Sequence, residues 1–114
     1  LNITPTRSDA RILIYVCYPS IRSYTTGNTR NRLNQHIKRN GSEIYTLNEM
    51  PQWRGANFAG SGVEINKNVN FVTIDSPNTT NQVTYTATWS SVDGHVWNTA
   101  SGQMTMICAE LTGY

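Results

Sequence analysis

Two histidines, His36 and His95, are the side chains best suited to acid–base chemistry near neutral pH. They lie in separate segments, and no Gly-x-Ser-x-Gly turn, His-Glu-x-x-His motif or phosphate-binding glycine loop accompanies them. A histidine on the polar side of a strand is typically a solvated surface group. The sequence therefore predicts no catalytic residues for nucleophilic or general-base chemistry.

Paired carboxylates could support glycoside hydrolysis, and Asp75, Asp93, Glu64 and Glu110 are acidic residues available for such a pair. Nothing in their spacing favours a pair. Asp75 precedes Ser76-Pro77 and is better explained as a turn residue, while Glu110 is expected to accept hydrogen bonds or to pair with an arginine. Two cysteines are too few for a zinc site. We expect a protein that is not an enzyme and that uses neither a cofactor nor a metal.

Binding chemistry has better material, because aromatic rings beside polar groups are common contact residues for sugars and proteins. Trp53 and Trp97 lie in loop-like contexts bordered by Gly or Asn, with Arg54, Asp93 and His95 as polar neighbours. We predict these five residues as the ligand-binding site. The alternative is that the tryptophans fill gaps in the core or between subunits.

The composition restricts the scaffold that could position these side chains. The chain has 114 residues, of which 38% are hydrophobic and only 14% charged, while 15 Thr, 13 Asn and 9 Ser supply most of the polarity. This length fits one domain, residues 1–114, and these polar residues suit turns and half-solvated strands better than helix interiors. No apolar run approaches the roughly 20 residues that span a bilayer, so we expect no membrane insertion.

The charge is distributed unevenly along the chain, although its net value is only +2. Residues 1–42 carry seven cations against one acid, and residues 43–114 carry two cations against six acids. A net charge this small predicts no nucleic-acid partner. If the early cations share a surface, that surface would attract acidic or phosphate-bearing glycans; otherwise they are solvated strand and loop ends.

Alternation of period two dominates the chain. In residues 11–18, and again in residues 104–111, both alternating sets are apolar, so both faces of these strands should be covered. We infer that something outside the chain covers one of them. Cys17 and Cys108 lie in these two runs and could pair, but buried free thiols are favoured.

Weaker strands are expected between these two runs. Residues 33–38 and 44–47 flank Asn40-Gly41 and predict a hairpin, with a helix over residues 31–38 as the competing interpretation. Residues 69–74 and 83–89 predict a second pair of strands, and a short strand is expected at residues 95–97. Residues 48–68 predict a long irregular connection. Seven or eight short strands are typical of an antiparallel β-sandwich or jelly roll.

Four motifs in this order resemble the C-terminal domains of bacteriophage tail-fibre and related virion-fibre proteins. The chain opens with Ile-Thr-Pro-Thr and Ala-Arg-Ile-Leu-Ile at residues 3–6 and 10–14, and residues 38–44 are similar to the family's R-N-G-T-x-I hairpin. Residues 75–85 resemble its D-S-P-x-T-T-x-x-V-T-Y segment, and residues 108–111 its closing A-x-E-(I/L). The similarity covers nearly the whole chain, but residues 48–68 and Trp97 match no family pattern.

The resemblance implies a jelly roll like that of tumour necrosis factor and complement heads, assembled as a homotrimer at the tip of a virion fibre. It also implies that the first and last strands are neighbours in one sheet facing the three-fold axis. The expected function is non-enzymatic recognition of a host bacterial surface glycan or outer-membrane protein during adsorption. The alternative is a structural trimerisation domain of a fibre or bacterial adhesin without its own ligand. The predicted trimer-interface residues are Leu13, Tyr15, Cys17, Met104, Met106 and Cys108.

Overall fold

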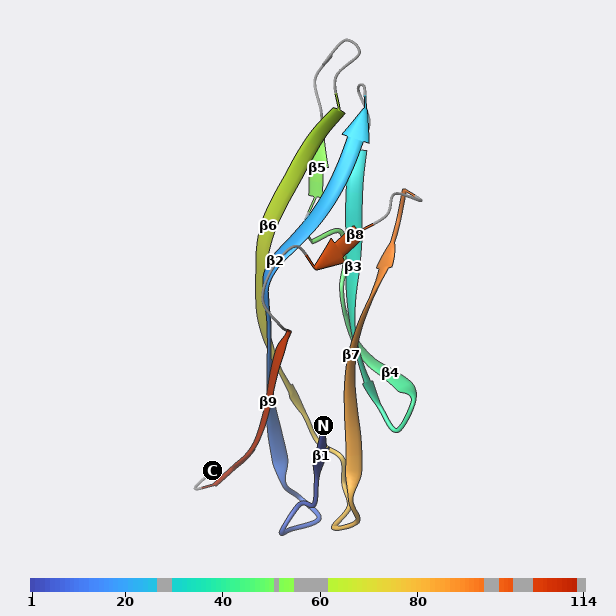
Figure 1. Ribbon diagram of the computed structural model, residues 1–114. Coiled ribbons are helices and arrows are strands. Elements are labelled where there is room, and N and C mark those ends of the chain that lie inside the picture. The colour runs from blue at the N-terminus through green and yellow to red at the C-terminus, as the bar shows by residue number, and fades with distance from the viewer. Residues whose placement is uncertain (27–29, 51, 55–61, 94–96, 100–103, 113–114) are drawn as a thin grey trace.

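The computed structural model describes residues 1–26, 30–50, 52–54, 62–93, 97–99 and 104–112, with the backbone alone at 23–26, 30, 52–54, 62–66 and 97–99. All the regular structure of these residues is β, as the sequence predicted, and it forms an elongated body (Figure 1) of 58 × 23 × 22 Å. Its strands are β1 (Asn2–Ile3), β2 (Arg11–Thr26), β3 (Arg30–Arg39), β4 (Ser42–Leu47), β5 (Gln52–Arg54), β6 (Gly62–Asp75), β7 (Val83–Ser91), β8 (Trp97–Thr99) and β9 (Thr105–Leu111).

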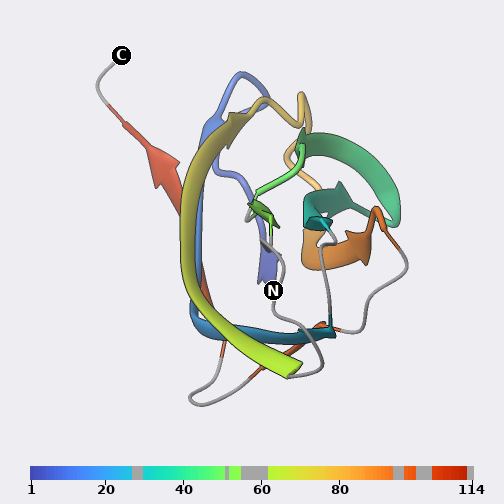
Figure 2. The same ribbon diagram turned by 90° about the horizontal axis from the view of Figure 1, so that it is seen from above.

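The strands form two antiparallel sheets that face each other across the core (Figure 2). The first has the order β1-β7-β3-β4, with β5 pairing with β3 as well, and the second is centred on β2, which pairs with β6 on one side and with β8 and β9 on the other. The arrangement is compatible with a β-sandwich. The first long strand, β2, and the last strand, β9, are neighbours as expected.

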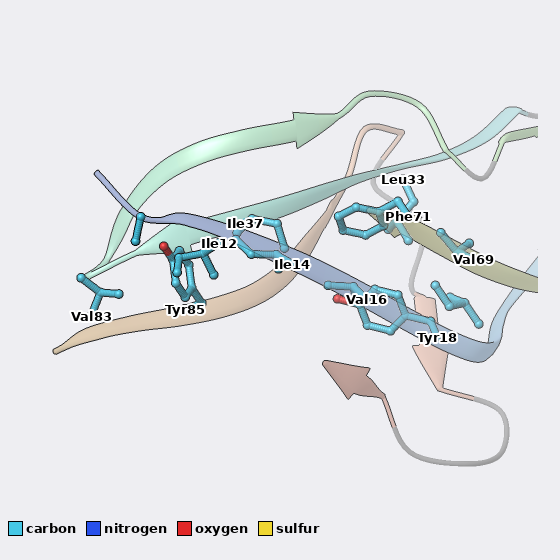
Figure 3. Packing of buried hydrophobic residues seen from close by; sticks show 12 residues of the cluster. Ile12, Ile14, Val16, Tyr18, Leu33, Ile37, Val69, Phe71, Val83 and Tyr85 are labelled. Atoms are coloured by element: carbon cyan, nitrogen blue, oxygen red, sulfur yellow. The ribbon is translucent and has the colours of Figure 1, made fainter. Parts of the chain in front are cut away.

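The core lies between the sheets and follows the alternation of β2 (Figure 3). The even-numbered residues of its first half point inward from Ile12 to Tyr18 and are at most 1% exposed, because side chains alternate across a strand. They pack against Val69 and Phe71 of β6 and against the inward side chains of the opposite sheet. That sheet contributes Leu33, Ile37, Val83 and Tyr85.

An irregularity at Pro19 divides β2 into two halves with different partners. The pairing with β6 shifts between Tyr18 and Ile21, and β9 pairs only with the half before this point while β8 pairs only after it. Proline has no N–H to donate to a ladder, which explains a bulge here. The strand expected to end at residue 18 therefore continues to Thr26.

The hairpin of β3 and β4 confirms the strand interpretation of residues 31–38 over the helix. Asn40 and Gly41 have φ values of 49° and 85°, as the two central residues of a type I′ turn require. The turn also docks on the start of β7, since the Asn40 N–H donates to the Thr84 carbonyl at 2.8 Å and the Thr84 N–H to Asn40 Oδ1 at 2.9 Å.

Two expectations about the middle of the chain were wrong. Residues 69–74 and 83–89 do not pair, because β6 joins β2 in one sheet while β7 joins β1 and β3 in the other. Residues 62–68 belong to β6 rather than to an irregular connection, and Gln52–Arg54 form β5. The segment between β6 and β7 crosses between the sheets, and proximity along the sequence does not reveal such a crossing.

A partly buried ion pair links the two sheets at one end of the core. Arg39 Nη1 of β3 donates to both carboxylate oxygens of Asp75, at 2.8 and 3.0 Å, and Asp75 closes β6. The Tyr85 hydroxyl donates to the same carboxylate at 2.6 Å. Burial and this carboxylate raise the pKa of Tyr85. Asp75, interpreted from the sequence as a turn residue, therefore joins β3, β6 and β7.

Candidate functional site

The outer side of the β6–β2–β9 sheet is an exposed apolar surface. Directly opposed residues of antiparallel strands share a face, so Tyr15 lies on it between Val72 of β6 and Ile107 of β9. Val72 is 55% exposed, Ile107 51% and Ile74 45%. We call this surface the apolar face and define it by Leu13, Tyr15, Cys17, Val72, Ile74, Ile107 and Ala109.

The strand register places the six predicted interface residues on different sides of the β2 sheet. Leu13, Tyr15 and Cys17 are half-buried and point outward with the apolar face. Met106 and Cys108 lie opposite Val16 and Ile14, so they point inward and pack against the core. Met104 precedes β9 and is 40% exposed. The placement of Met106 and Cys108 is a correction. Ile107 and Ala109 are the outward residues of β9, because only the register determines which alternating set of an entirely apolar strand faces out.

The two cysteines lie on opposite sides of the same sheet. Both are free and half-buried, with Cys17 on the apolar face and Cys108 toward the core. This separation prevents an intrachain disulfide, as the sequence interpretation favoured. Burial raises the pKa of the Cys108 thiol. Hydrogen bonding with the neighbouring Cys17 is the main cause that raises the pKa of Tyr15, and the Tyr15 hydroxyl also donates to Asn70 Oδ1 of β6 at 3.4 Å.

The outer side of the β7–β3–β4 sheet has the opposite character. Its outward side chains are polar from β7 across to β4, and they form cross-strand hydrogen bonds. We call this surface the polar face and define it by Asn34, His36, Lys38, Glu43, Thr46, Thr86, Thr88 and Ser90. The described parts of the two sheets thus present a polar and an apolar outer surface.

The predicted ligand-binding residues are divided between the two sheets. Trp53 and Arg54 lie in β5, where their backbone pairs with residues 30 and 31 of β3. Trp97 lies in β8 and pairs with residue 23 of β2 in the other sheet. The side chains of these three residues, and His95 as a whole, lie outside what the structure describes.

Asp93, the remaining residue of that set, is held by an arginine. Arg32 donates to its carboxylate through Nη2 at 2.7 Å and Nε at 3.0 Å, and through Nη1 to Glu49 at 2.6 Å. Hydrogen bonding to Asp93 is the main cause that raises the pKa of Arg32. Because the Asp93 side chain is only 18% exposed, its described role is to fasten the segment after β7 to β3.

Ion pairs also account for several of the early cations. Besides Arg32, Arg39 pairs with Asp75 between the two sheets and Arg7 pairs with Asp9 at an exposed turn. These three cations lie at separate points of the fold, as expected for strand and loop ends rather than for one basic surface.

A cavity of about 290 Å³ opens between the sheets beside the bulge of β2. It is lined by Tyr18, Ala87, Thr88, Trp89 and Met104. The Tyr18 and Trp89 rings meet edge to face with centroids 5.1 Å apart. The Tyr18 hydroxyl is buried without a hydrogen-bond partner, and this burial raises its pKa to about 12. Trp89 is thus partly buried and packs against the core.

Comparison of the chain with protein-family models, curated proteins and solved structures found no match in any of the three. The described part of the chain contains no helix that is long and apolar enough to cross a membrane. The same residues contain no cluster of three metal-ligating side chains.

Proposed function

We propose that this chain is the receptor-binding tip of a phage fibre, a homotrimeric jelly-roll domain that recognises a bacterial surface glycan or outer-membrane protein. The observation that carries the proposal is the apolar face. Contiguous exposed apolar surface is rare on monomeric proteins and marks an interaction site. Its occupant in this proposal is the same face of two sister chains around a three-fold axis.

Three features support a second copy as the occupant. The apolar face covers three strands of one sheet, whereas the outer side of the other sheet is polar. The centre of the apolar face around Tyr15 carries no charged side chain, as is typical of the centre of a stable interface. The polar Asn70 and Thr105 lie opposite Cys17 at one end of it. β2 is the middle strand of this face and β9 lies beside it, in line with the neighbouring first and last strands that the resemblance to fibre-tip domains implies.

In this proposal the trimer provides avidity for adsorption. Three copies present three equivalent sites, and binding at one raises the effective concentration at the others. Adsorption through Trp53, Arg54, Asp93, His95 and Trp97 would then need only weak contacts at each site. The domain would act at the outer end of a virion fibre, facing the host surface.

The experiment that tests recognition uses the substitutions Trp53→Ala and Trp97→Ala, each in the full chain. We expect both variants to keep the native mass of the wild type and to lose binding to host cells. Unchanged cell binding by both would overturn the assignment of the site. Trp89→Ala is an unsuitable control because Trp89 packs against the core, so Thr86→Ala on the polar face is used instead.

A structural role is the second candidate function, in which the domain only locks the trimer of a fibre or bacterial adhesin. The engagement of Asp93 favours it, since the described polar residue of the predicted binding site is held by Arg32. This function predicts that cell binding is absent in the wild type while the trimer is stable.

A further inference from the structure

Three side chains from three different strands lie in contact on the polar face, and the central one, His36, also has Thr46 Oγ1 at 3.3 Å from its Nδ1 atom. His36 of β3 lies between Glu43 of β4 and Ser90 of β7. The Nδ1 atom of His36 is 2.8 Å from Glu43 Oε2, and its Nε2 atom is 2.8 Å from Ser90 Oγ. Carboxylate, imidazole and hydroxyl in this order are the components of an activated serine nucleophile.

The surroundings of Glu43 determine which nitrogen of His36 carries a proton. The Thr46 hydroxyl donates to Glu43 Oε1, and this bond, followed by the nearby His36 and Lys38, lowers the pKa of the carboxyl. An ionised carboxylate can only accept, so Nδ1 donates to it when the ring is neutral. Nε2 then has the free lone pair that accepts from the Ser90 hydroxyl. This tautomer is the one that a general base requires.

A serine nucleophile must be accessible to substrate, and its general base must be held in place. Ser90 is exposed at the surface, whereas the His36 side chain is only 16% exposed and is held between two strands. The titratable and charged groups facing His36 are Glu43 on β4 and Lys38 on its own strand, while its neighbours on β7 are the neutral Thr88 and Ser90. The polar face also lies on the opposite side of the body from the apolar face, so assembly leaves it open.

We propose that Ser90 is a nucleophile toward carboxylic esters, with His36 as its general base and Glu43 as the residue that positions His36. Ser90 Oγ forms a bond to the ester carbonyl carbon while its proton passes to His36 Nε2. The bond to the leaving alcohol breaks, and the alcohol takes up that proton, leaving an acyl group on Ser90. Water then releases the acid and restores the serine. This activity goes beyond receptor binding and does not depend on it.

Acetylation by p-nitrophenyl acetate tests the proposal on the full chain at neutral pH, with occupancy of each site measured by peptide mass spectrometry. We expect an acetyl group on Ser90, and roughly 100-fold slower labelling of that residue in His36→Gln, which is within the range of general-base contributions. Ser91→Ala, at the neighbouring position on the same strand, is the matched control and should label at the wild-type rate. Labelling of lysine or the N-terminus without Ser90 would overturn the proposal, as would an unchanged Ser90 rate in His36→Gln.

The role of Glu43 is tested by the tautomer of His36 in nitrogen-15 NMR spectra of the neutral ring. We expect the proton on Nδ1 in the wild type and a shift toward Nε2 in Glu43→Gln, accompanied by slower labelling of Ser90. A wild-type ring protonated on Nε2 would contradict the proposal. This measurement on the wild type remains decisive if a His36 variant does not fold.

Discussion

The two outer surfaces of this molecule are built on the same principle and have opposite chemistry. On the apolar face, Tyr15 lies between Val72 of β6 and Ile107 of β9. About half of the surface of Val72 and of Ile107 is exposed. On the polar face, His36 occupies the equivalent middle strand and lies between Thr46 and Thr88. A sheet packed on one side presents polar residues on the other when that side meets water.

The two faces differ in how much hydrophobic surface the single chain leaves exposed to water. On the polar face His36 has cross-strand hydrogen bonds with Thr46 and Ser90, whereas the apolar face leaves hydrophobic side chains exposed. Burial of that face against further copies would remove this surface from water, at a gain of roughly 25 cal/mol per Å² of apolar area. The comparison therefore supports the proposal that the apolar face is the subunit interface and that the polar face stays open to solvent.

The largest effect should follow from a charge on the apolar face. Val72→Asp is expected to convert the assembled protein to a monomer, because an unpaired carboxylate in an apolar interface costs several kcal/mol. Val72 is 55% exposed in the single chain, so its fold should tolerate the change. Light scattering measures the native mass.

Thr86→Asp provides the matched control on the polar face and should leave the native mass unchanged. If both Val72→Asp and Thr86→Asp kept the wild-type native mass, the apolar face would not be a subunit interface. Dissociation by Thr86→Asp alone would reverse the assignment.

The next largest effect concerns the ion pair of Arg39 and Asp75, which links the two sheets that carry the outer faces. Asp75→Ala should lower the free energy of unfolding by about 2 kcal/mol, because Arg39 and the Tyr85 hydroxyl both lose a charged acceptor. Urea denaturation measures the change. Asp9→Ala breaks an exposed pair with Arg7 and should cost below about 1 kcal/mol. Equal losses in the two variants would show that Asp75 has no special role.

The cysteines distinguish the outer side of the β2 sheet from its inner side. In assembled protein, both thiols should alkylate slowly, since Cys17 would be covered by neighbouring copies and Cys108 faces the core. In the Val72→Asp monomer, Cys17 should react about tenfold faster than in the wild type while Cys108 changes little, given that its thiol keeps the raised pKa that burial produces. Mass spectrometry after timed iodoacetamide treatment gives both rates, and equal acceleration of the two would indicate general loosening instead.

The smallest expected effect is a dependence of stability on acid pH. Hydrogen bonds from the Thr6 hydroxyl and Thr6 N–H lower the pKa of Glu110 below its usual 4.5. Its contribution is therefore present above pH 4.5 and is lost as pH falls through the lower folded value. Thermal unfolding followed at pH 3–6 should show a shallower acid loss in Glu110→Gln than in the wild type. A parallel pH dependence in both proteins would exclude this group as a cause.

The sequence predicted most of the local structure because the relevant signals are local. Asn40-Gly41 can adopt two positive φ values at little cost, and this alone specifies the hairpin of β3 and β4. The pairing of β6 with β2 rather than β7 could not be obtained in the same way. It depends on a crossing between the two sheets after Asp75. The residue types between Asp75 and Val83 do not indicate which sheet the next strand joins.

The site was predictable to a smaller extent. Apolar alternation indicated that β2 and β9 need an external cover, and it predicted Leu13, Tyr15 and Cys17, whose side chains do point outward. It could not predict whether Met106 or Ile107 faces outward, because the residues on both sides of β9 are apolar. Only the register with β2 shows which side is outward. Val72 and Ile74 were missed, although their alternation with Phe71 and Thr73 carried the same signal. The bond between His36 and Ser90 joins residues 54 positions apart, so spacing could not reveal it.

The measurement that tests the central claim most directly is the native mass of the wild-type chain by light scattering in dilute neutral buffer, with a reducing control for Cys17 and Cys108. A single species of three chains, unchanged by reductant, is the result predicted if the apolar face is a subunit interface. A monomer of 12.8 kDa across the accessible concentration range would contradict it.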